Sequence, residues 1–473
     1  MTTKKTAKQS FRIESDSMGE MKIPSEAYYG AQTARAVENF QISGQRPHER
    51  FVWAGLQLKK ATATVNGELG TIGKKQAKAI VKAADEALTG KFADSFVVDV
   101  YQAGAGTSHH MNINEVLANR ANELLGVRKR GTYKFVHPND HVNFGQSTND
   151  VIPTCIRLAT LSLAKELIAE GTALAKSFRK KSKQFEKIFK SGRTHWQDAT
   201  PVTLGQEWGA YATAVEKLVA GVKNTLPELQ EIGLGGTAVG TGINSHPKYR
   251  RAVAAQLQKQ TKLGIKPAKD YFERMQSLAP FVAVSGALRN LAQDISRIAN
   301  DLRLLSSGPN VGLAEIKLPA VQPGSSIMPG KVNPVIAEMT NMICFQILGN
   351  DQAILWAAQA GQMELNVMMP LIAWNLPQSF TIMINCLKTL RTKCIDGVVA
   401  NKEACLRYAM STSSLVTVLN PIIGYRKAAE VFKRSLATGE SIPDVVVAMG
   451  LMTSAEVKKA IDLKKMVKPG VAR

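Results

Sequence analysis

Between residues 288 and 305, aliphatic side chains recur at alternating steps of three and four residues. This spacing places them along one face of an α-helix, with arginine and aspartate at the positions between them. Gly308 and Pro309 follow shortly after and end the helical pattern. The segment therefore predicts a long helix that packs lengthwise against other helices through Leu288, Leu291, Ile295, Ile298, Leu302 and Leu305.

Three further segments carry a helical periodicity, over residues 153–189, 204–222 and 334–355. Loops rich in glycine and proline join these segments, and strand patterns are few. No alternation of strands with helices competes with this interpretation. The sequence therefore predicts an all-α fold built around a long helical bundle.

The bundle pattern starts near residue 147 and ends near residue 402. A mixed segment with glycine-containing loops precedes it, and a short lysine-rich tail with two small helical patterns follows it. We therefore expect three domains: an N-terminal domain over residues 1–146, the central bundle over residues 147–402 and a small helical domain over residues 403–473.

The composition, 45% hydrophobic and 21% charged over 473 residues, is typical of a packed protein. No stretch reaches the roughly 18 apolar residues of a membrane-spanning helix, and no apolar stretch follows the N-terminal lysines as in a signal peptide. We therefore expect a cytoplasmic protein. The five cysteines form no C-x-x-C pair, so we expect reduced thiols in the core at Cys155, Cys344, Cys386, Cys394 and Cys405.

The chain is strongly basic, with 60 lysines and arginines against 38 acidic residues and a net charge of +22. The lysines are spread along the chain, and no basic stripe is interleaved with aromatic residues. We therefore expect neither a nucleic acid nor a membrane as partner. Two interpretations of the charge remain open: a solvated basic surface, and attraction of a small dicarboxylate toward its site.

Four polar loops stand out, at residues 104–115, 137–150, 192–207 and 322–334. Each precedes a predicted long helix, whose first turn exposes unpaired N–H groups and partial positive charge. Helix capping alone accounts for any one such loop. Four together favour a site for carboxylate or phosphate oxygens.

The last of these loops, QPGSSIMPGKVNP, combines a flexible turn with chemically active side chains. Its glycines allow a sharp bend, and Pro334 suits the first position of the following helix. Such a loop can bring the oxygen of one of its two serines to a substrate carbon while Lys331 and Asn333 hold a carboxylate.

This loop resembles the signature loop of the aspartase/fumarase superfamily. The segments RIESDSMGEMKIPSEAYYGAQTARAVENF, LGGTAVGTGIN, GQMELNVMMP and LNPIIGY, together with all four polar loops, are similar to that family in the same order. The resemblance implies a three-domain, mainly helical protomer whose central domain assembles into a homotetramer. It further implies active sites that are each built from loops of three subunits.

The resemblance also implies a reaction, the anti-elimination of ammonia or water from a succinate skeleton to give fumarate. It assigns Ser325 as the general base and places His195 at the leaving group, oriented by Glu338. In the sequence no carboxylate or histidine cluster has the spacing of metal ligands and no phosphate-binding loop precedes a strand, so we expect no metal and no organic cofactor. The substrate contacts that the resemblance implies are Thr107, Ser147, Thr148, Asn149, Thr194, Ser326, Lys331 and Asn333, with Asn244 as a further carboxylate contact.

Members of the family differ mainly in the leaving group, which is ammonia or water. Ala105 in GAGT and Thr148 in STND are similar to aspartases, as are YYGAQT and CFQILGND, whereas HPNDHVN and LGGTAVGTG are similar to fumarases. The sequence favours release of ammonia from L-aspartate, and hydration of fumarate to L-malate, as in class II fumarate hydratases, is the alternative. A non-catalytic scaffold or nucleic-acid binder is a third hypothesis, disfavoured by the intact site residues.

Three residues depart from the family pattern. His109 and His110 stand where small or amide residues are common, His110 in the place of a usual asparagine, and Trp196 is bulkier than the usual residue. The two imidazoles either alter contacts to the leaving group or pack at a subunit interface. Trp196 would narrow the pocket.

Overall fold

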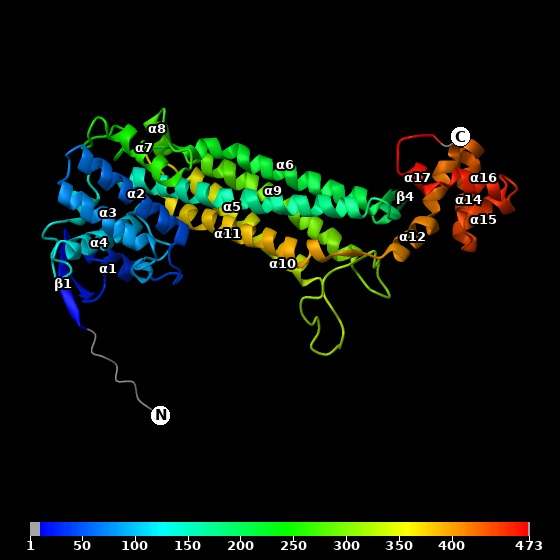
Figure 1. The fold of residues 1–473 in the computed structure, drawn as a ribbon, viewed down its shortest axis with the longest axis horizontal. Helices are drawn as coiled ribbons and strands as arrows, with labels where there is room; N and C mark the ends of the chain where they lie inside the picture. Colours follow the sequence, from blue (N-terminus) through cyan, green and yellow to red (C-terminus); the bar gives the residue numbers. More distant parts are fainter. Residues whose placement is uncertain (1–9, 472–473) are drawn as a thin grey trace, which may run out of the picture. The chain divides into compact units, whose positions relative to one another are not determined.

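Helices dominate the computed structural model, which describes residues 10–471 (Figure 1). The all-α fold class is therefore confirmed. The first nine residues, which include the lysines discussed above, lie outside the described residues. Among the helices that are described, none has the length and apolarity that crossing a membrane requires.

Five helices of 25 or more residues appear: α5 (Thr148–Gln184), α6 (Leu204–Gln230), α9 (Ala279–Leu305), α10 (Val335–Gln359) and α11 (Met369–Lys393). The first four correspond to predicted segments. Helix α5 ends before residue 189 because residues Phe189–Thr194 form strand β3. The periodicity argument had not singled out α11, which contains Pro377 in its interior.

Shorter elements surround these helices. Before α5 lie α1 (Ala31–Asn39), α2 (Glu49–Glu68), α3 (Lys74–Leu88) and α4 (Thr107–Leu124), and α7 (Tyr249–Thr261) and α8 (Tyr271–Gln276) lie between α6 and α9. The C-terminal helices are α12 (Lys402–Ser411), α13 (Asn420–Ile423), α14 (Tyr425–Thr438), α15 (Ile442–Ala448), α16 (Ser454–Ala460) and α17 (Leu463–Met466).

The strands are short and pair two by two. Antiparallel pairs join β1 (Phe11–Asp16) with β2 (Gly19–Pro24), β3 with β4 (Gln197–Thr203), and β7 (Ile316–Lys317) with β8 (Val399–Ala400). One parallel pair joins β5 (Glu231–Ile232) with β6 (Lys266–Pro267).

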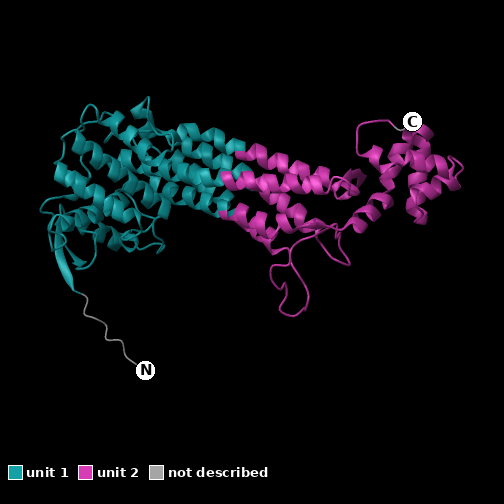
Figure 2. Ribbon diagram, viewed as in Figure 1, with its two compact units in different colours: residues 1–168, 220–292, 345–384 teal, residues 169–219, 293–344, 385–473 magenta. Residues whose placement is uncertain are grey.

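The chain divides into two compact units (Figure 2). Unit 1 contains residues 1–168, 220–292 and 345–384, and unit 2 contains residues 169–219, 293–344 and 385–473. Each of the five long helices contributes residues to both units. The three-domain division at residues 146 and 402 stays a prediction.

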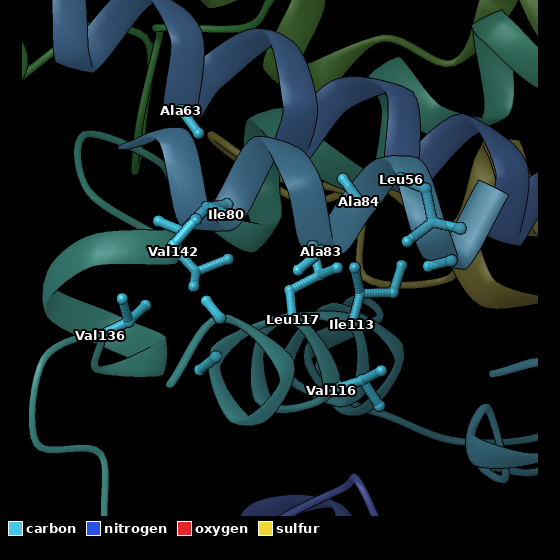
Figure 3. Close-up of a cluster of buried hydrophobic side chains, with 14 of the residues drawn as sticks. Leu56, Ala63, Ile80, Ala83, Ala84, Ile113, Val116, Leu117, Val136 and Val142 are labelled. Carbon is cyan, nitrogen blue, oxygen red and sulfur yellow. The ribbon is translucent and has the colours of Figure 1, made fainter. Parts of the chain in front are cut away.

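In unit 1, helices α2, α3 and α4 enclose an apolar core (Figure 3). Ala83 and Ala84 of α3 are fully buried, and their small side chains let the helix approach Ile113 and Leu117 of α4 closely. Burying one such isoleucine or leucine stabilises the fold by about 1.5–3 kcal/mol. This core fixes the N-terminal end of α4, where Thr107 begins the helix.

In unit 2, aromatic rings join α5 to α6. Trp208, fully buried, packs edge-on against Phe185 with 5.3 Å between ring centroids and also contacts Phe178 at 5.7 Å. Tyr211 on the next turn donates a hydrogen bond to Asp301 of α9 at 3.0 Å. The C-terminal helices have a separate small core around Leu415, Val431, Val445 and Val446.

The five cysteines are free thiols and buried, as predicted. His109 is buried inside unit 1, where its ring contacts Phe51 edge-on at 5.7 Å. This position answers the question that the sequence left open for His109: the imidazole packs in the interior of its own chain.

Burial lowers the pKa of His109 to about 4. As the pH falls from 6.5 to about 4, the unfolded chain therefore binds a proton that the folded chain excludes. We expect acid to remove up to about 3 kcal/mol of stability through this group. In His109→Leu, the melting temperature should consequently fall less steeply than in the wild type between these pH values. An equal slope in the two proteins would contradict this interpretation.

Candidate active site

Two of the four predicted loops meet in unit 1 at the start of α4 and α5. The Oγ1 atoms of Thr107 and Thr148 lie 3.1 Å apart, and Thr107 also donates to the carbonyl oxygen of Gly104 at 2.7 Å. Gly106, at a φ of +98°, makes the turn that brings Thr107 to the helix start, and a Cβ there would collide with Ile152. The structure therefore brings two predicted substrate contacts together from loops 41 residues apart.

A buried carboxylate attaches a further predicted loop to this pair. Asp150 accepts three backbone hydrogen bonds, from Ser147 at 3.0 Å and from Gly235 and Thr237 at 2.9 Å each. Burial raises the pKa of Asp150 to about 7, against the three N–H groups, which favour the charged form. From the sequence, Asp150 was predicted only as part of a loop, and its role as acceptor of these N–H groups was not recognised.

A further hydrogen bond attaches the LGGTAVGTGIN loop, residues 234–244, to the start of α5. Asn149 donates its side-chain amide to the carbonyl oxygen of Ala238 at 2.7 Å. Asn244 is exposed and adopts a left-handed conformation with a φ of +61°. Asparagine tolerates this conformation better than most residues, so its type at this position has a backbone reason beside any contact to substrate.

A second charged group, Lys59, is buried in the same unit and was not singled out from the sequence. Its ammonium group lies 2.7 Å from His110 Nε2 and donates to the amide oxygens of Asn143 and Gln146. His110 Nδ1 in turn lies 2.9 Å from Thr148 Oγ1. His110 is therefore packed inside its own chain, in hydrogen-bond distance of a predicted substrate contact.

In unit 2, Thr194 and His195 lie in the hairpin that joins β3 to β4. His195 and Trp196 form its two-residue turn with φ angles of +53° and +62°. Turns of this kind favour glycine and asparagine, and a histidine or tryptophan there costs about 1 kcal/mol or more. Both side chains are exposed, Trp196 at 77%. The sequence analysis did not predict this hairpin, because its turn carries neither preferred residue.

The base of the hairpin rests on a buried charge cluster. Glu315, fully buried, forms ion pairs at 2.9 Å with both Lys190 and Arg193 of β3. Lys190 also bonds Glu207, whose pKa burial raises. A cavity of about 300 Å³ beside the cluster is lined in part by His195 and Trp196.

The signature loop, also in unit 2, is closed on itself by hydrogen bonds. Gly324 donates its N–H to the carbonyl oxygen of Lys331 at 2.8 Å, and its own carbonyl accepts the Asn333 amide at 2.7 Å. Ser325 Oγ accepts the backbone N–H groups of Ile327 and Met328 at 3.2 and 3.0 Å. Two aligned N–H groups on one oxygen stabilise negative charge there.

The remaining predicted residues occupy accessible positions in unit 2. Ser326 and Lys331 are exposed, and Glu338 is partly exposed in the first turn of α10. The pairing of Glu338 with His195 stays a prediction. The described residues, 10–471, contain no group of three or more His, Cys, Asp or Glu side chains arranged to hold a metal.

The chain is similar to known lyases over nearly its whole length. Sequence models of the families described as lyase and as fumarase C C-terminus match residues 19–349 and 415–468. An aspartate ammonia-lyase of Helicobacter pylori strain J99 is 45% identical over 460 residues, which cover 97% of this chain and 98% of that protein.

Two solved structures share the fold. A fumarate lyase:delta crystallin of Brucella melitensis gives a TM-score of 0.93 at 44% identity, covering 97% of this chain and all of the other. A class II fumarase of Schistosoma mansoni gives a TM-score of 0.94 at 35% identity, covering 97% of this chain and 99% of the other.

We expect Asp150→Asn to destabilise the protein by about 2–3 kcal/mol. The asparagine places an NH2 group where one carboxylate oxygen stood. At least one of the three backbone N–H groups therefore loses its acceptor. Urea unfolding measures the loss, and Asp140→Asn, which alters an exposed acid of the preceding loop, serves as the control. Equal stability of Asp150→Asn and the wild type would show that the carboxylate does not hold these loops.

Proposed function

The chain belongs to the aspartase/fumarase superfamily of lyases, and on this basis we propose that it is an aspartate ammonia-lyase, which converts L-aspartate reversibly to fumarate and ammonia. The greater identity to an ammonia-lyase than to a class II fumarase supports a carbon–nitrogen lyase. The substrate is a dicarboxylate, and no cofactor is part of the proposal. The cytoplasm is the proposed location.

The single observation that carries the mechanism is the environment of Ser325. The reaction removes a proton from a carbon next to a carboxylate, which places a second negative charge on that carboxylate. An alcohol serves as base only if its ionised form is stabilised. The two N–H groups on Ser325 Oγ supply that stabilisation, so we assign Ser325 as the general base.

We assign the other predicted residues to the two carboxylates and the amino group of the substrate. In the proposed site, Ser326, Lys331 and Asn333 bind the carboxylate that becomes a dianion, and a lysine cation suits this position best. His195, oriented by Glu338, faces the departing amino group together with Thr194. The remaining contacts to the second carboxylate and the amino group are Thr107, Ser147, Thr148, Asn149 and Asn244.

We propose that these groups assemble in a homotetramer with sites shared by three subunits. Helix α10 supports this assembly, because Met342, Phe345 and Trp356 are 60–69% exposed along it. Large exposed apolar side chains gathered on one helix mark a protein–protein interface. The exposure of His195, Ser326 and Lys331 in the single chain agrees with residues that await partners from neighbouring subunits.

Hydration of fumarate is the second candidate function, favoured by the HPNDHVN and LGGTAVGTG segments and by the structural match to a class II fumarase. Ala105, where class II fumarases usually carry serine, argues against it. The alanine offers no hydroxyl group for a carboxylate.

Purified protein should form fumarate, followed by its ultraviolet absorbance, from L-aspartate and not from L-malate. Ser325→Ala should lower kcat by at least about a hundredfold, the usual contribution of a positioned base. Ser411→Ala, which alters an exposed serine of α12, is the control and should keep wild-type activity. Fumarate formed from L-malate alone would overturn the proposed leaving group. Near-normal turnover by Ser325→Ala would overturn the base.

The shared site predicts complementation between two inactive variants, Ser325→Ala and Thr148→Val. If the two residues reach one site from different subunits, about a quarter of the sites in an equal mixture carry both intact. Co-expression should therefore restore up to this fraction of wild-type activity, although each variant alone is inactive. If both residues came from one subunit, no mixed assembly would contain an intact site, and activity would stay absent.

A further inference from the structure

Lys59 is surrounded by three hydrogen-bond acceptors inside unit 1. Its Nζ atom lies 2.7 Å from Gln146 Oε1, 3.2 Å from Asn143 Oδ1 and 2.7 Å from His110 Nε2. A protonated lysine has three N–H donors and no acceptor, so it matches this set one to one.

The orientation of the two amides supports the assignment independently. The Nδ2 group of Asn143 donates to the backbone carbonyl of Gln146 at 3.2 Å. The Nε2 group of Gln146 donates to the carbonyl oxygens of Val142 and Phe144 at 3.0 and 3.3 Å. With both nitrogens engaged elsewhere, both amide oxygens face Lys59 and require a donor there.

The ammonium group fixes the tautomer of His110. Burial, together with the nearby lysine charge, lowers the pKa of His110, so the ring is neutral and carries one proton. Because Nε2 accepts from Lys59, that proton sits on Nδ1. Nδ1 therefore donates to Thr148 Oγ1, 2.9 Å away.

The hydroxyl of Thr148 has one hydrogen to give. When His110 donates to the oxygen, the ring does not compete for this hydrogen. Thr107 Oγ1, 3.1 Å away, is a neutral acceptor within the chain, and a ligand carboxylate is the stronger acceptor. In the opposite tautomer, Nδ1 would accept the hydrogen and turn a lone pair toward the ligand instead. We propose that Lys59 and His110 are positioning residues that fix the Thr148 hydroxyl as a hydrogen-bond donor to a carboxylate oxygen of the substrate.

The identity of the ligand in this inference rests on the proposed function. The tautomer of His110 is argued from the contacts of Lys59 and does not depend on that function. The titratable groups that face Lys59 are His110 from α4 and Asp150 and Cys155 from α5. Burial lowers the pKa of Lys59 to about 7, and the charge of Asp150 opposes this shift. Below this pH the lysine carries all three N–H donors that the surrounding acceptors require.

Two substitutions of His110 separate donation from packing. The side-chain amide of His110→Asn reaches the place of Nδ1 and can still donate to Thr148, as the asparagine usual in the family would. The amide of His110→Gln reaches the place of Nε2, so it can satisfy Lys59 but leaves Thr148 without its donor.

We expect His110→Asn to keep KM for L-aspartate within about twofold of the wild type. We expect His110→Gln to raise KM by about three- to tenfold, because the neutral hydrogen bond that fixes the Thr148 hydroxyl is lost and the hydroxyl is free to rotate. Thermal unfolding checks that both variants fold. Equal KM values in the two variants would overturn the proposed orientation of Thr148 by His110, since a packing role alone does not distinguish the two variants.

The tautomer is measured directly by ¹⁵N NMR of histidine-labelled enzyme below the pKa of Lys59, with His110→Asn identifying the signal by its absence. We expect a protonated Nδ1 and an unprotonated Nε2, the reverse of the common neutral form. A protonated Nε2 would overturn the inference. This spectrum needs no turnover, so a protein that proved inactive toward L-aspartate would refute the proposed function and leave this test intact.

Discussion

One buried carboxylate, Asp150, holds together the end of unit 1 where the predicted substrate contacts Thr107 and Thr148 lie. Its two oxygens collect backbone N–H groups from residues 147, 235 and 237, and so connect the start of α5 to the loop that follows α6. A charge in the interior is stable only when such donors surround it. The ammonium of Lys59 favours that charge, and in our proposal it also orients His110 and Thr148. In this account, buried groups that do not contact the ligand determine how the Thr148 hydroxyl is oriented toward it.

In unit 2, ion pairs and backbone hydrogen bonds likewise fix the two loops that carry His195 and Ser325. The hairpin turn at His195 is held in an unfavourable backbone conformation, and the ion pairs of Glu315 with Lys190 and Arg193 fix the strand beneath it. The Ser325 loop is closed by bonds between Gly324, Lys331 and Asn333, which leave two N–H groups directed at the serine oxygen. Both loops present reactive side chains on backbone that is already ordered.

The sequence predicted the bundle well because helical periodicity is a local signal. The run from Leu288 to Leu305 forms the last two thirds of α9, and Glu338 lies in the first turn of α10 as expected. The family motifs identified the loops, and the contact between Thr107 and Thr148 joins two of them. The roles of Lys59 and Asp150 could not be recognised from the sequence, because they depend on burial and on hydrogen-bond partners from distant segments of the chain. The hairpin at His195 was missed because its turn lacks the glycine or asparagine on which turn prediction depends.

The central claim is that a serine oxygen surrounded by N–H groups in unit 2 reaches a dicarboxylate held by the threonines of unit 1 in another subunit. A crystal structure of the assembled enzyme with a bound substrate analogue tests this most directly. The account predicts Ser325 Oγ at about 3–3.5 Å from the carbon that loses its proton, with Thr148 of a neighbouring subunit on a carboxylate. A dicarboxylate bound at Thr148 with Ser325 of every subunit remote from it would contradict the account.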